Sequence, residues 1–342
     1  MNKQILIHTA ETLLGGNKGL LAMDESNGTC NKRFAKIGIP QTEEIRRNWR
    51  ALIVTTPNLE ECISGVILYD ETVHQETKDG TLIIKTIIDA GMVPGIKVDI
   101  GAKTMAGHPG EKVTEGLDGL RERLKEYYDL GARFAKWRAV FIIDEGIPTR
   151  SCIEANANVL ARYAALCQEA GLVPIIEPEV LMKGKHNMHK CFEITEDVLK
   201  TVFNQLFRQG ILLEGMILKP NMVMPGVNCT DHSTVHQVAD ATVRCLLQSV
   251  PAAVAGIAFL SGGQTGKLAT EHLNAIHVRF KSKLPWPVTF SFARAIQQPA
   301  MGIWKGDEKN IMAAQQALYH RAKCNHLAAN GEYSEAVELM IS

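Results

Sequence analysis

Short apolar segments alternate along the chain with longer amphipathic segments. The amphipathic segments, such as residues 119–131 and 195–210, repeat apolar residues three and four positions apart, which predicts helices with one buried face. Each apolar segment has the length of a buried strand and ends in polar or charged residues. We predict eight such strands, within residues 19–26, 63–71, 92–99, 132–141, 172–179, 214–220, 255–263 and 287–294.

Eight strands that alternate with helices predict a parallel sheet, and the count of eight favours a closed (β/α)8 barrel. We therefore expect a single α/β domain over residues 1–342, a TIM barrel with extra helices near both termini, one of them in the segment after residue 306. The alternative is an open, doubly wound sheet that binds a dinucleotide. That fold would need a G-x-G-x-x-G turn after the first strand, and residues 24–34, DESNGTCNKRF, do not contain it.

Charge and hydropathy limit the partners of this chain. Lys plus Arg is 37 and Asp plus Glu is 37, so the formal net charge is zero. This balance argues against nucleic acid and against an anionic membrane as partners. The longest apolar stretch, residues 250–260, is too short to span a bilayer, and residues 1–16 contain no secretory signal. We expect a cytoplasmic protein.

Cysteine and histidine spacing predicts no metal site and no disulfides. The eight cysteines are dispersed without a C-x-x-C pair, as is typical of a reduced cytosolic protein. His186 with His189, and His232 with His236, have spacings that could bind a metal ion. Neither pair has a glutamate at the metalloprotease position, so we interpret these histidines as solvated side chains.

Chemically active residues gather where the predicted strands end. The active site of a barrel lies at the C-terminal ends of its strands, and residues i and i+2 of a strand share a face. Charged residues at the same level on most strands are hard to explain as structural ion pairs, because an unpaired buried charge is costly. We therefore predict a polar site there. The strand ends carry Asp24, Tyr69, Lys97, Asp99, Lys136, Arg138, Glu177, Glu179, Lys219, Ser261, Ser291 and Arg294.

The balance of charges within this set favours an anionic substrate. The set has five cations and four carboxylates, and the excess of cations becomes two when Arg33, from the helix after the first strand, is counted. The segment SGGQ, residues 261–264, follows the seventh strand, where barrels often hold a phosphate on backbone N–H groups. Arg294 follows the eighth strand, and a guanidinium can bind phosphate with two hydrogen bonds. These features predict a phosphate site.

Lysines at the strand ends indicate carbonyl chemistry through an imine. A lysine becomes nucleophilic when burial or a second cation favours its neutral form. Lys219 closes the apolar run GMILK, and Lys136 could supply the neighbouring charge. Carboxylates such as Glu177 and Asp24 could move protons during carbinolamine dehydration and C–C cleavage. Such a reaction needs no metal or other cofactor, because the iminium accepts the electrons.

The motifs FAKWR, EPE and LKPNM form a highly specific combination. With them, the sequence resembles the class I, or Schiff-base, fructose-bisphosphate aldolases over nearly the whole chain. This resemblance implies a TIM barrel, usually assembled as a homotetramer. The main matching segments are LAMDES (21–26), FAKWR (134–138), VPIIEPE (173–179), LKPNMV (218–223), FLSGGQ (259–264) and TFSFAR (289–294).

The resemblance also implies catalytic roles for individual residues. Lys219 matches the lysine that forms the Schiff base with dihydroxyacetone phosphate. Glu177 matches the acid/base that dehydrates the carbinolamine, with Glu179 as its partner. Lys136 matches the second active-site lysine, and Asp24 the carboxylate that helps to remove the C4 hydroxyl proton.

A second group of residues is expected to bind substrate on the same resemblance. Lys97 and Arg138 match cations of the site. The residues that match the phosphate site are Ser261, Gly262, Gly263, Ser291 and Arg294. The residues that match polar groups near the other phosphate are Ser26, Arg33 and Arg46.

The chain departs from the animal pattern in two places. Phe292 and Ala293 stand where animal enzymes usually have Tyr and Gly. Animal enzymes also have a flexible tail ending in Tyr that serves proton exchange at the enamine, whereas the last tyrosine here is Tyr333 and the sequence ends at Ser342. We expect a different proton source, and the preference for the bisphosphate over fructose 1-phosphate stays open.

The function implied by the resemblance is reversible cleavage of fructose 1,6-bisphosphate to dihydroxyacetone phosphate and glyceraldehyde 3-phosphate. One alternative is a Schiff-base aldolase for another phosphosugar, such as fructose 1-phosphate. Another is a weakly catalytic scaffold that binds partner proteins. The intact set of Lys219, Lys136, Glu177 and Asp24 argues against the scaffold.

Overall fold

Eight parallel strands close into a barrel in the computed structural model, which describes residues 2–340. The strands follow one another around the barrel in chain order, and each coincides with a predicted apolar segment, although β7 extends one residue beyond its segment, so the predicted (β/α)8 architecture is confirmed. The barrel strands are β1 (Gly19–Ala22), β2 (Ile63–Leu68), β3 (Val93–Lys97), β6 (Phe134–Phe141), β7 (Val173–Val180), β8 (Ile217–Leu218), β9 (Gly256–Phe259) and β10 (Val288–Phe292).

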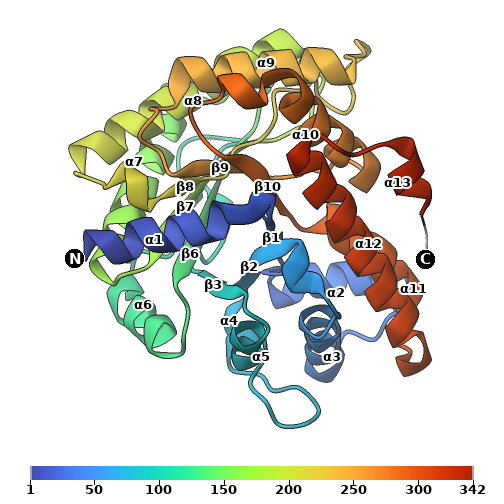
Figure 1. Cartoon of the computed structure of the whole chain (residues 1–342). Coiled ribbons are helices and arrows are strands. Elements are labelled where there is room, and N and C mark those ends of the chain that lie inside the picture. Colours follow the sequence, from blue (N-terminus) through green and yellow to red (C-terminus); the bar gives the residue numbers. More distant parts are fainter. Residues whose placement is uncertain (1, 341–342) are drawn as a thin grey trace.

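Helices surround the barrel on its outer face (Figure 1). The extra helices predicted near both termini are present as α1 and as α12 with α13. The helices are α1 (Lys3–Leu14), α2 (Asn27–Ala35), α3 (Glu43–Val54), α4 (Asp70–Val73), α5 (Ile83–Asp89), α6 (Leu120–Asp129), α7 (Arg150–Glu169), α8 (Met188–Arg208), α9 (Val235–Ser249), α10 (Gly266–Phe280), α11 (Arg294–Trp304), α12 (Ile311–Asn330) and α13 (Glu335–Leu339).

Helix α8 illustrates how the sequence forms the outer layer. Its N-cap, Asn187, accepts a hydrogen bond from the N–H of Lys190, which satisfies one of the free donors of the first turn. Gly210, just after the helix, has a φ of 67°, a left-handed conformation that ends the helix. The side chains that face the core recur three or four positions apart: Cys191, Thr195, Val198, Val202 and Leu206.

The N-terminal end of the barrel is closed by α1, which lies across the strands in Figure 1. Its residues Leu6 and Leu13 are fully buried in one apolar cluster with Leu20, Phe134 and Val173, which lie at or near the starts of β1, β6 and β7. This packing excludes water from that end of the barrel. The opposite end, where the strands finish, therefore provides the open face.

A small antiparallel hairpin was not predicted. Strands β4 (Ala102–Thr104) and β5 (Lys112–Thr114) pair with each other between β3 and α6. Each is three residues long, too short for an alternating pattern to be recognised. Ala102 lies on the wall of the main cavity, so the hairpin forms part of the rim on the open face.

All eight cysteines are free thiols. Seven of them are buried, and Cys229 is partly exposed. Among residues 2–340, no helix combines the length and the apolar character required to cross a membrane.

Glycines inside the barrel make room for aromatic rings. A Cβ atom on Gly95 would lie 2.2 Å from the ring of Phe134, which pairs in register with Gly95 on the next strand. A Cβ atom on Gly19 would likewise lie 2.3 Å from the ring of Phe290. Both rings are fully buried, so neither can move into solvent.

We predict that Gly95→Ala destabilises the barrel. The added methyl group overpacks the Phe134 ring, which should reduce the free energy of unfolding by about 1–3 kcal/mol. Urea denaturation measures the change. Gly302→Ala is the matched control, because no atom lies within 4 Å of its Cβ position in α11, and it should stabilise the protein by up to about 1 kcal/mol. Equal stabilities of the two variants would contradict the packing argument.

Candidate active site

A cavity of about 480 Å³ opens at the C-terminal ends of the strands. Every barrel strand except β2 contributes a wall residue from the strand itself or from the positions just after it. The wall includes five carboxylates and six cations, so charge pairing decides its chemistry. The predicted residues on this wall are Asp24, Ser26, Lys97, Asp99, Lys136, Arg138, Glu177, Glu179, Lys219, Ser261, Gly262, Gly263, Ser291 and Arg294.

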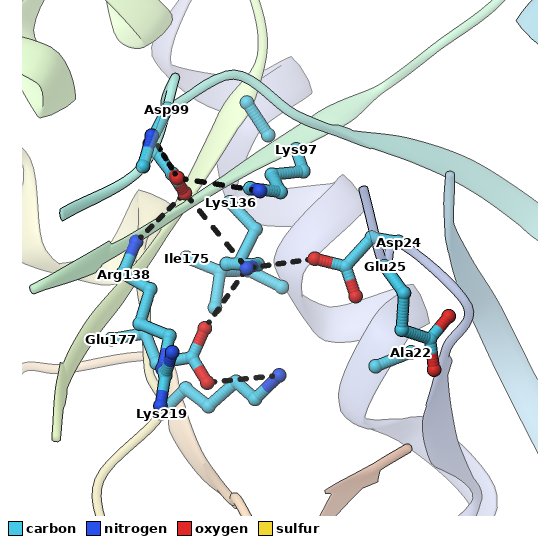
Figure 2. Close-up of polar contacts among 12 residues, drawn as sticks. Ala22, Asp24, Glu25, Lys97, Asp99, Lys136, Arg138, Ile175, Glu177 and Lys219 are labelled. Atoms are coloured by element: carbon cyan, nitrogen blue, oxygen red, sulfur yellow. Dashed lines mark hydrogen bonds and ion pairs between the residues drawn. The ribbon is translucent and has the colours of Figure 1, made fainter. Parts of the chain in front are cut away.

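Lys136 lies at the centre of the charged cluster, as Figure 2 shows. Its Nζ is 2.7 Å from Oδ2 of Asp24, 3.2 Å from Oε2 of Glu177 and 3.9 Å from Oδ2 of Asp99. These carboxylates come from β7 and from the segments just after β1 and β3. Lys136 is only 4% exposed, so water screens these ion pairs poorly.

Lys219 reaches the same cluster from the end of β8. Its Nζ is 3.3 Å from Oε1 of Glu177, while Lys136 binds the other oxygen of that carboxylate. Glu177 therefore bridges the two lysines (Figure 2). Lys219 is 3% exposed and has this single carboxylate partner among the described residues.

Arg138, Glu179 and Asp99, which lie two positions after Lys136, Glu177 and Lys97, also line the cavity. Arg138 forms an ion pair through Nε with Glu179, the residue two positions after Glu177. Lys97 contacts Asp99, with Nζ 3.5 Å from Oδ1. The Asp99 carboxylate also accepts a hydrogen bond from the backbone N–H of Arg138 at 3.2 Å, which fixes its orientation.

The cluster holds its members in their charged forms. Burial on its own raises the pKa of Asp24, but Lys136, Lys219 and Lys97 outweigh it, so the pKa lies well below the ordinary value. Burial likewise raises the pKa of Glu177, and Lys136 and Lys219 lower it below its usual range. For Lys136 burial lowers the pKa, and Asp24, Glu177 and Asp99 raise it far above its ordinary value.

A cradle suited to an anion lies beside Lys219. Gly262 and Gly263 follow β9 with φ angles of 55° and 93°, which favour glycine. Nη2 of Arg294, the first residue of α11, would be 3.3 Å from a Cβ atom on Gly263. The buried hydroxyl of Ser291 lies on the cavity wall and has no hydrogen-bond partner among the described residues. Together these groups offer donors that are free to bind a phosphate.

A second group of donors on the cavity wall comes from the start of α2, the helix that follows β1. Ser26 is the N-cap of this helix, and its Oγ is 3.1 Å from Oγ1 of Thr29. Both residues line the cavity near Lys97. A helix N-terminus favours negative charge, so this group suits a second anion.

Arg33 and Arg46 do not line the cavity. Arg33 forms an ion pair with Glu25, which turns away from the lysine cluster in Figure 2. Arg46 donates two hydrogen bonds to Glu71, at 2.8 and 2.6 Å. Because each guanidinium already has a carboxylate partner, this arrangement leaves less of its charge for a phosphate, and the role expected for these two residues stays a prediction.

Three other residues named from the sequence also lie away from the cavity wall. Tyr69 contacts Lys97 through its ring, 5.6 Å from the Nζ, and lines a neighbouring cavity instead. The hydroxyl of Tyr333 donates to Glu338 at 2.6 Å, outside the main cavity. His186 is not solvated as expected, because both ring nitrogens are buried in a loop against Gly184.

The remaining histidines of the two pairs agree with the expectation. His189, His232 and His236 are exposed. Within residues 2–340, no group of three or more His, Cys, Asp or Glu side chains is arranged to hold a metal ion.

Several residues of the cavity wall were not predicted from the sequence, among them Thr29, Met182 and Lys183. Thr29 could have been found from its position in the first turn of the helix that Ser26 caps. Met182 and Lys183 lie on the loop between β7 and α8, beyond the strand ends where we looked for charged residues. Their position depends on how the loop folds back over the barrel.

Comparison with known proteins places these features in one family. The family model described as fructose-bisphosphate aldolase class-I matches residues 5–341. A probable fructose-bisphosphate aldolase class 1 from Xanthomonas campestris is 54% identical, over 97% of this chain and 99% of that protein. The cytosolic fructose-bisphosphate aldolase 6 of Arabidopsis thaliana is 48% identical, over 98% of this chain and 93% of that protein.

A solved structure agrees with the sequence comparison. The fructose-bisphosphate aldolase of Plasmodium falciparum, crystallised in complex with TRAP and a small molecule inhibitor, superimposes with a TM-score of 0.95. The two chains are 44% identical, and the match covers 97% of this chain and 96% of the other. With a barrel of the same form and a family match over nearly its whole length, this chain belongs to the class I fructose-bisphosphate aldolase family.

Proposed function

We propose that this chain cleaves fructose 1,6-bisphosphate reversibly to dihydroxyacetone phosphate and glyceraldehyde 3-phosphate, through a Schiff base on Lys219. The family match carries the reaction. Glu177 bridges Lys219 and Lys136 inside a cavity that also contains the anion cradle. This arrangement supports the roles that we assign to the individual residues.

Lys219 is the nucleophile in this proposal because it is held less tightly than Lys136. Lys136 has three carboxylates within 4 Å, which keep it protonated. Lys219 has one. Loss of its proton breaks a single ion pair, and the neutral amine can then attack the C2 carbonyl of the substrate.

One proton transfer prepares both the nucleophile and the acid. Nζ of Lys219 and Oε1 of Glu177 are 3.3 Å apart, so the ammonium proton can pass to the carboxylate. The amine adds to the carbonyl, and the protonated Glu177 then donates to the departing hydroxyl of the carbinolamine. Glu179, paired with Arg138, lies on the same face of β7 and helps to position Glu177.

Cleavage of the C3–C4 bond requires a base for the C4 hydroxyl. We assign this role to Asp24, which Lys136 holds in the ionised form. The proton moves to Asp24, the C4 carbon becomes the aldehyde carbonyl, and the bonding electrons pass to the iminium to form an enamine. Protonation of that enamine at C3 and hydrolysis then release the three-carbon product and regenerate Lys219.

The two phosphates occupy the two groups of donors. Ser261, Gly262, Gly263, Ser291 and Arg294 bind the phosphate of the three-carbon half, because β9 and β10 follow the Lys219 strand around the barrel. Ser26 and Lys97 bind the other phosphate. Arg33 and Arg46 support this end through the carboxylates that they neutralise. A site with donors at both ends favours the bisphosphate over fructose 1-phosphate.

We further propose that the chain is one catalytic domain, residues 1–342, that works as a cytoplasmic homotetramer without a cofactor. The active-site cavity draws on strands from the whole length of the sequence, which supports one domain. Exposed apolar side chains such as Phe207 and Met312 supply surface that a subunit contact could bury. The cytosolic relative from Arabidopsis supports the location.

The charge states in this mechanism predict a specific pH dependence of stability. The folded-state pKa of Asp24 lies below its ordinary value of 3.8, so its contribution is present above about pH 4 and is lost as the pH falls further. The difference in unfolding free energy between wild type and Asp24→Asn should therefore be largest near neutral pH and should shrink below about pH 4. Urea denaturation across this range measures it.

The control for this series is Asp129→Asn. Asp129 is exposed and pairs with Lys125 one helical turn away, so its removal should change stability by less than about 1 kcal/mol. A difference for Asp24→Asn that stays constant from pH 7 to about pH 3 would mean that Lys136 does not hold this carboxylate ionised.

We predict that borohydride with dihydroxyacetone phosphate attaches a three-carbon adduct to Lys219 alone. Peptide mapping by mass spectrometry locates the adduct. Lys219→Met should abolish cleavage and keep the fold, because Met has nearly the volume of Lys and suits a buried position. Lys136→Met is the comparison, and it should slow the reaction while Lys219 can still be trapped. An adduct on Lys136 would overturn the assignment.

Arg294→Ala should weaken substrate binding with little effect on folding. A lost charge-assisted contact of about 1.5–3 kcal/mol corresponds to a rise in KM of about 10- to 150-fold. Steady-state kinetics with fructose 1,6-bisphosphate gives the value. Arg279→Ala, which breaks a surface ion pair with Asp240, should leave KM unchanged. An unchanged KM for Arg294→Ala would show that Arg294 does not bind the phosphate.

A further inference from the structure

The loop between β7 and α8 places a lysine on the wall of the cavity. Lys183 lies three residues after the end of β7, is exposed to solvent and lines the cavity. The mechanism above does not use it. No motif in the sequence marks this position.

Backbone hydrogen bonds fix the loop on both sides of Lys183. The carbonyl of Met182 accepts from the N–H of Val227 at 2.8 Å, and the carbonyl of Gly184 accepts from the N–H of Asn228 at 3.0 Å. Just before them, the N–H of Leu181 donates to the carbonyl of Phe141 at 2.8 Å. The backbone of Lys183 is therefore positioned by its neighbours, and only its side chain is free to move.

The same loop contacts the anion cradle directly. A Cβ atom on Gly262 would lie 3.4 Å from Sδ of Met182, the residue before Lys183. Met182 therefore packs against the glycine turn, and Lys183, the next residue, lines the same cavity. Nη2 of Arg294 would lie 3.3 Å from a Cβ atom on Gly263, the other glycine of the turn. Lys183 and Arg294 thus share the cavity wall that contains this turn.

Charge pairing separates these two cations from the others on the wall. Lys97, Lys136, Arg138 and Lys219 each have a carboxylate within 4 Å. Lys183 and Arg294 have none among residues 2–340. An anion that binds them breaks no existing ion pair, so their charge is available to a substrate.

We propose that Lys183 is a specificity-determining residue that binds, together with Arg294, the phosphate of the three-carbon half of the substrate. The proposal rests on the proposed function, because it adds a second cation to the phosphate site of that reaction. Lys183 lies at the mouth, whereas the reacting carbons lie at Lys219, so it attracts and holds the substrate without touching the bonds that change.

An exposed cation at a cavity mouth has a recognisable kinetic signature. Its attraction for a dianion raises the rate of association and is screened by salt. Loss of the charge should therefore raise KM, leave kcat almost unchanged, and matter less at high ionic strength. For Lys183→Ala in low salt we expect KM to rise about three- to tenfold. This change is larger than the loss of an exposed ion pair would cause and smaller than the loss of a buried charged hydrogen bond.

The experiment compares Lys183→Ala with Lys185→Ala. Lys185 is exposed on the same loop and carries the same charge, but it does not line the cavity. Each variant is assayed with fructose 1,6-bisphosphate and with fructose 1-phosphate, in low and high salt. Lys183→Ala should raise KM for both substrates by the same factor, because both have the C1 phosphate. Lys183→Arg should restore KM, and Lys185→Ala should match wild type.

Each other outcome overturns the proposal. An unchanged KM for Lys183→Ala would show that its charge does not reach the phosphate. Equal losses for Lys183→Ala and Lys185→Ala would show a general effect of loop charge. A loss with the bisphosphate alone would assign Lys183 to the other phosphate. Failure of the wild-type protein to cleave either sugar would instead refute the proposed function, so the two failures are distinguishable.

Discussion

The ion pairs of Lys136 with three carboxylates hold the catalytic centre together. A buried cation costs several kcal/mol unless charges and hydrogen bonds compensate it, and the same is true of each carboxylate around it. Lys136, Asp24, Glu177 and Asp99 are all less than 10% exposed, so none of them can be satisfied by water alone. Removing one member leaves the others short of a partner, which explains why the centre behaves as one electrostatic unit.

The barrel makes this cluster possible because it brings strand ends from distant parts of the sequence to one level. Lys97 and Lys136 are in register on β3 and β6, and their like charges would repel each other without Asp99, which lies within 4 Å of both. At the other end of the barrel, α1 and its apolar cluster keep water out. The polar end is therefore stabilised by ion pairs, and the closed end by apolar packing.

Much of this arrangement could be predicted from the sequence because strand geometry is regular. Alternation along a strand places Lys136 with Arg138, and Glu177 with Glu179, on one face, and the structure puts all four on the cavity wall. Helices and loops are less predictable. Arg33 and Arg46 each have a carboxylate partner that depends on how α2 and α3 pack, and the course of the Lys183 loop depends on backbone hydrogen bonds to residues 226–228. Such contacts between distant segments leave no local pattern.

The division of the wall cations into paired and unpaired groups suits a reaction in which protons move but phosphates do not. In the proposed mechanism, proton transfer between Lys219 and Glu177 leaves the net charge of the buried cluster unchanged at that step. In the proposed function the phosphates keep their charge throughout, and the phosphate of the three-carbon half binds where Arg294 has no competing carboxylate among residues 2–340. If Arg294 were paired as Arg138 is, each binding event would have to break an ion pair first. This separation would let the three-carbon end of the substrate bind tightly while the centre stays free to exchange protons.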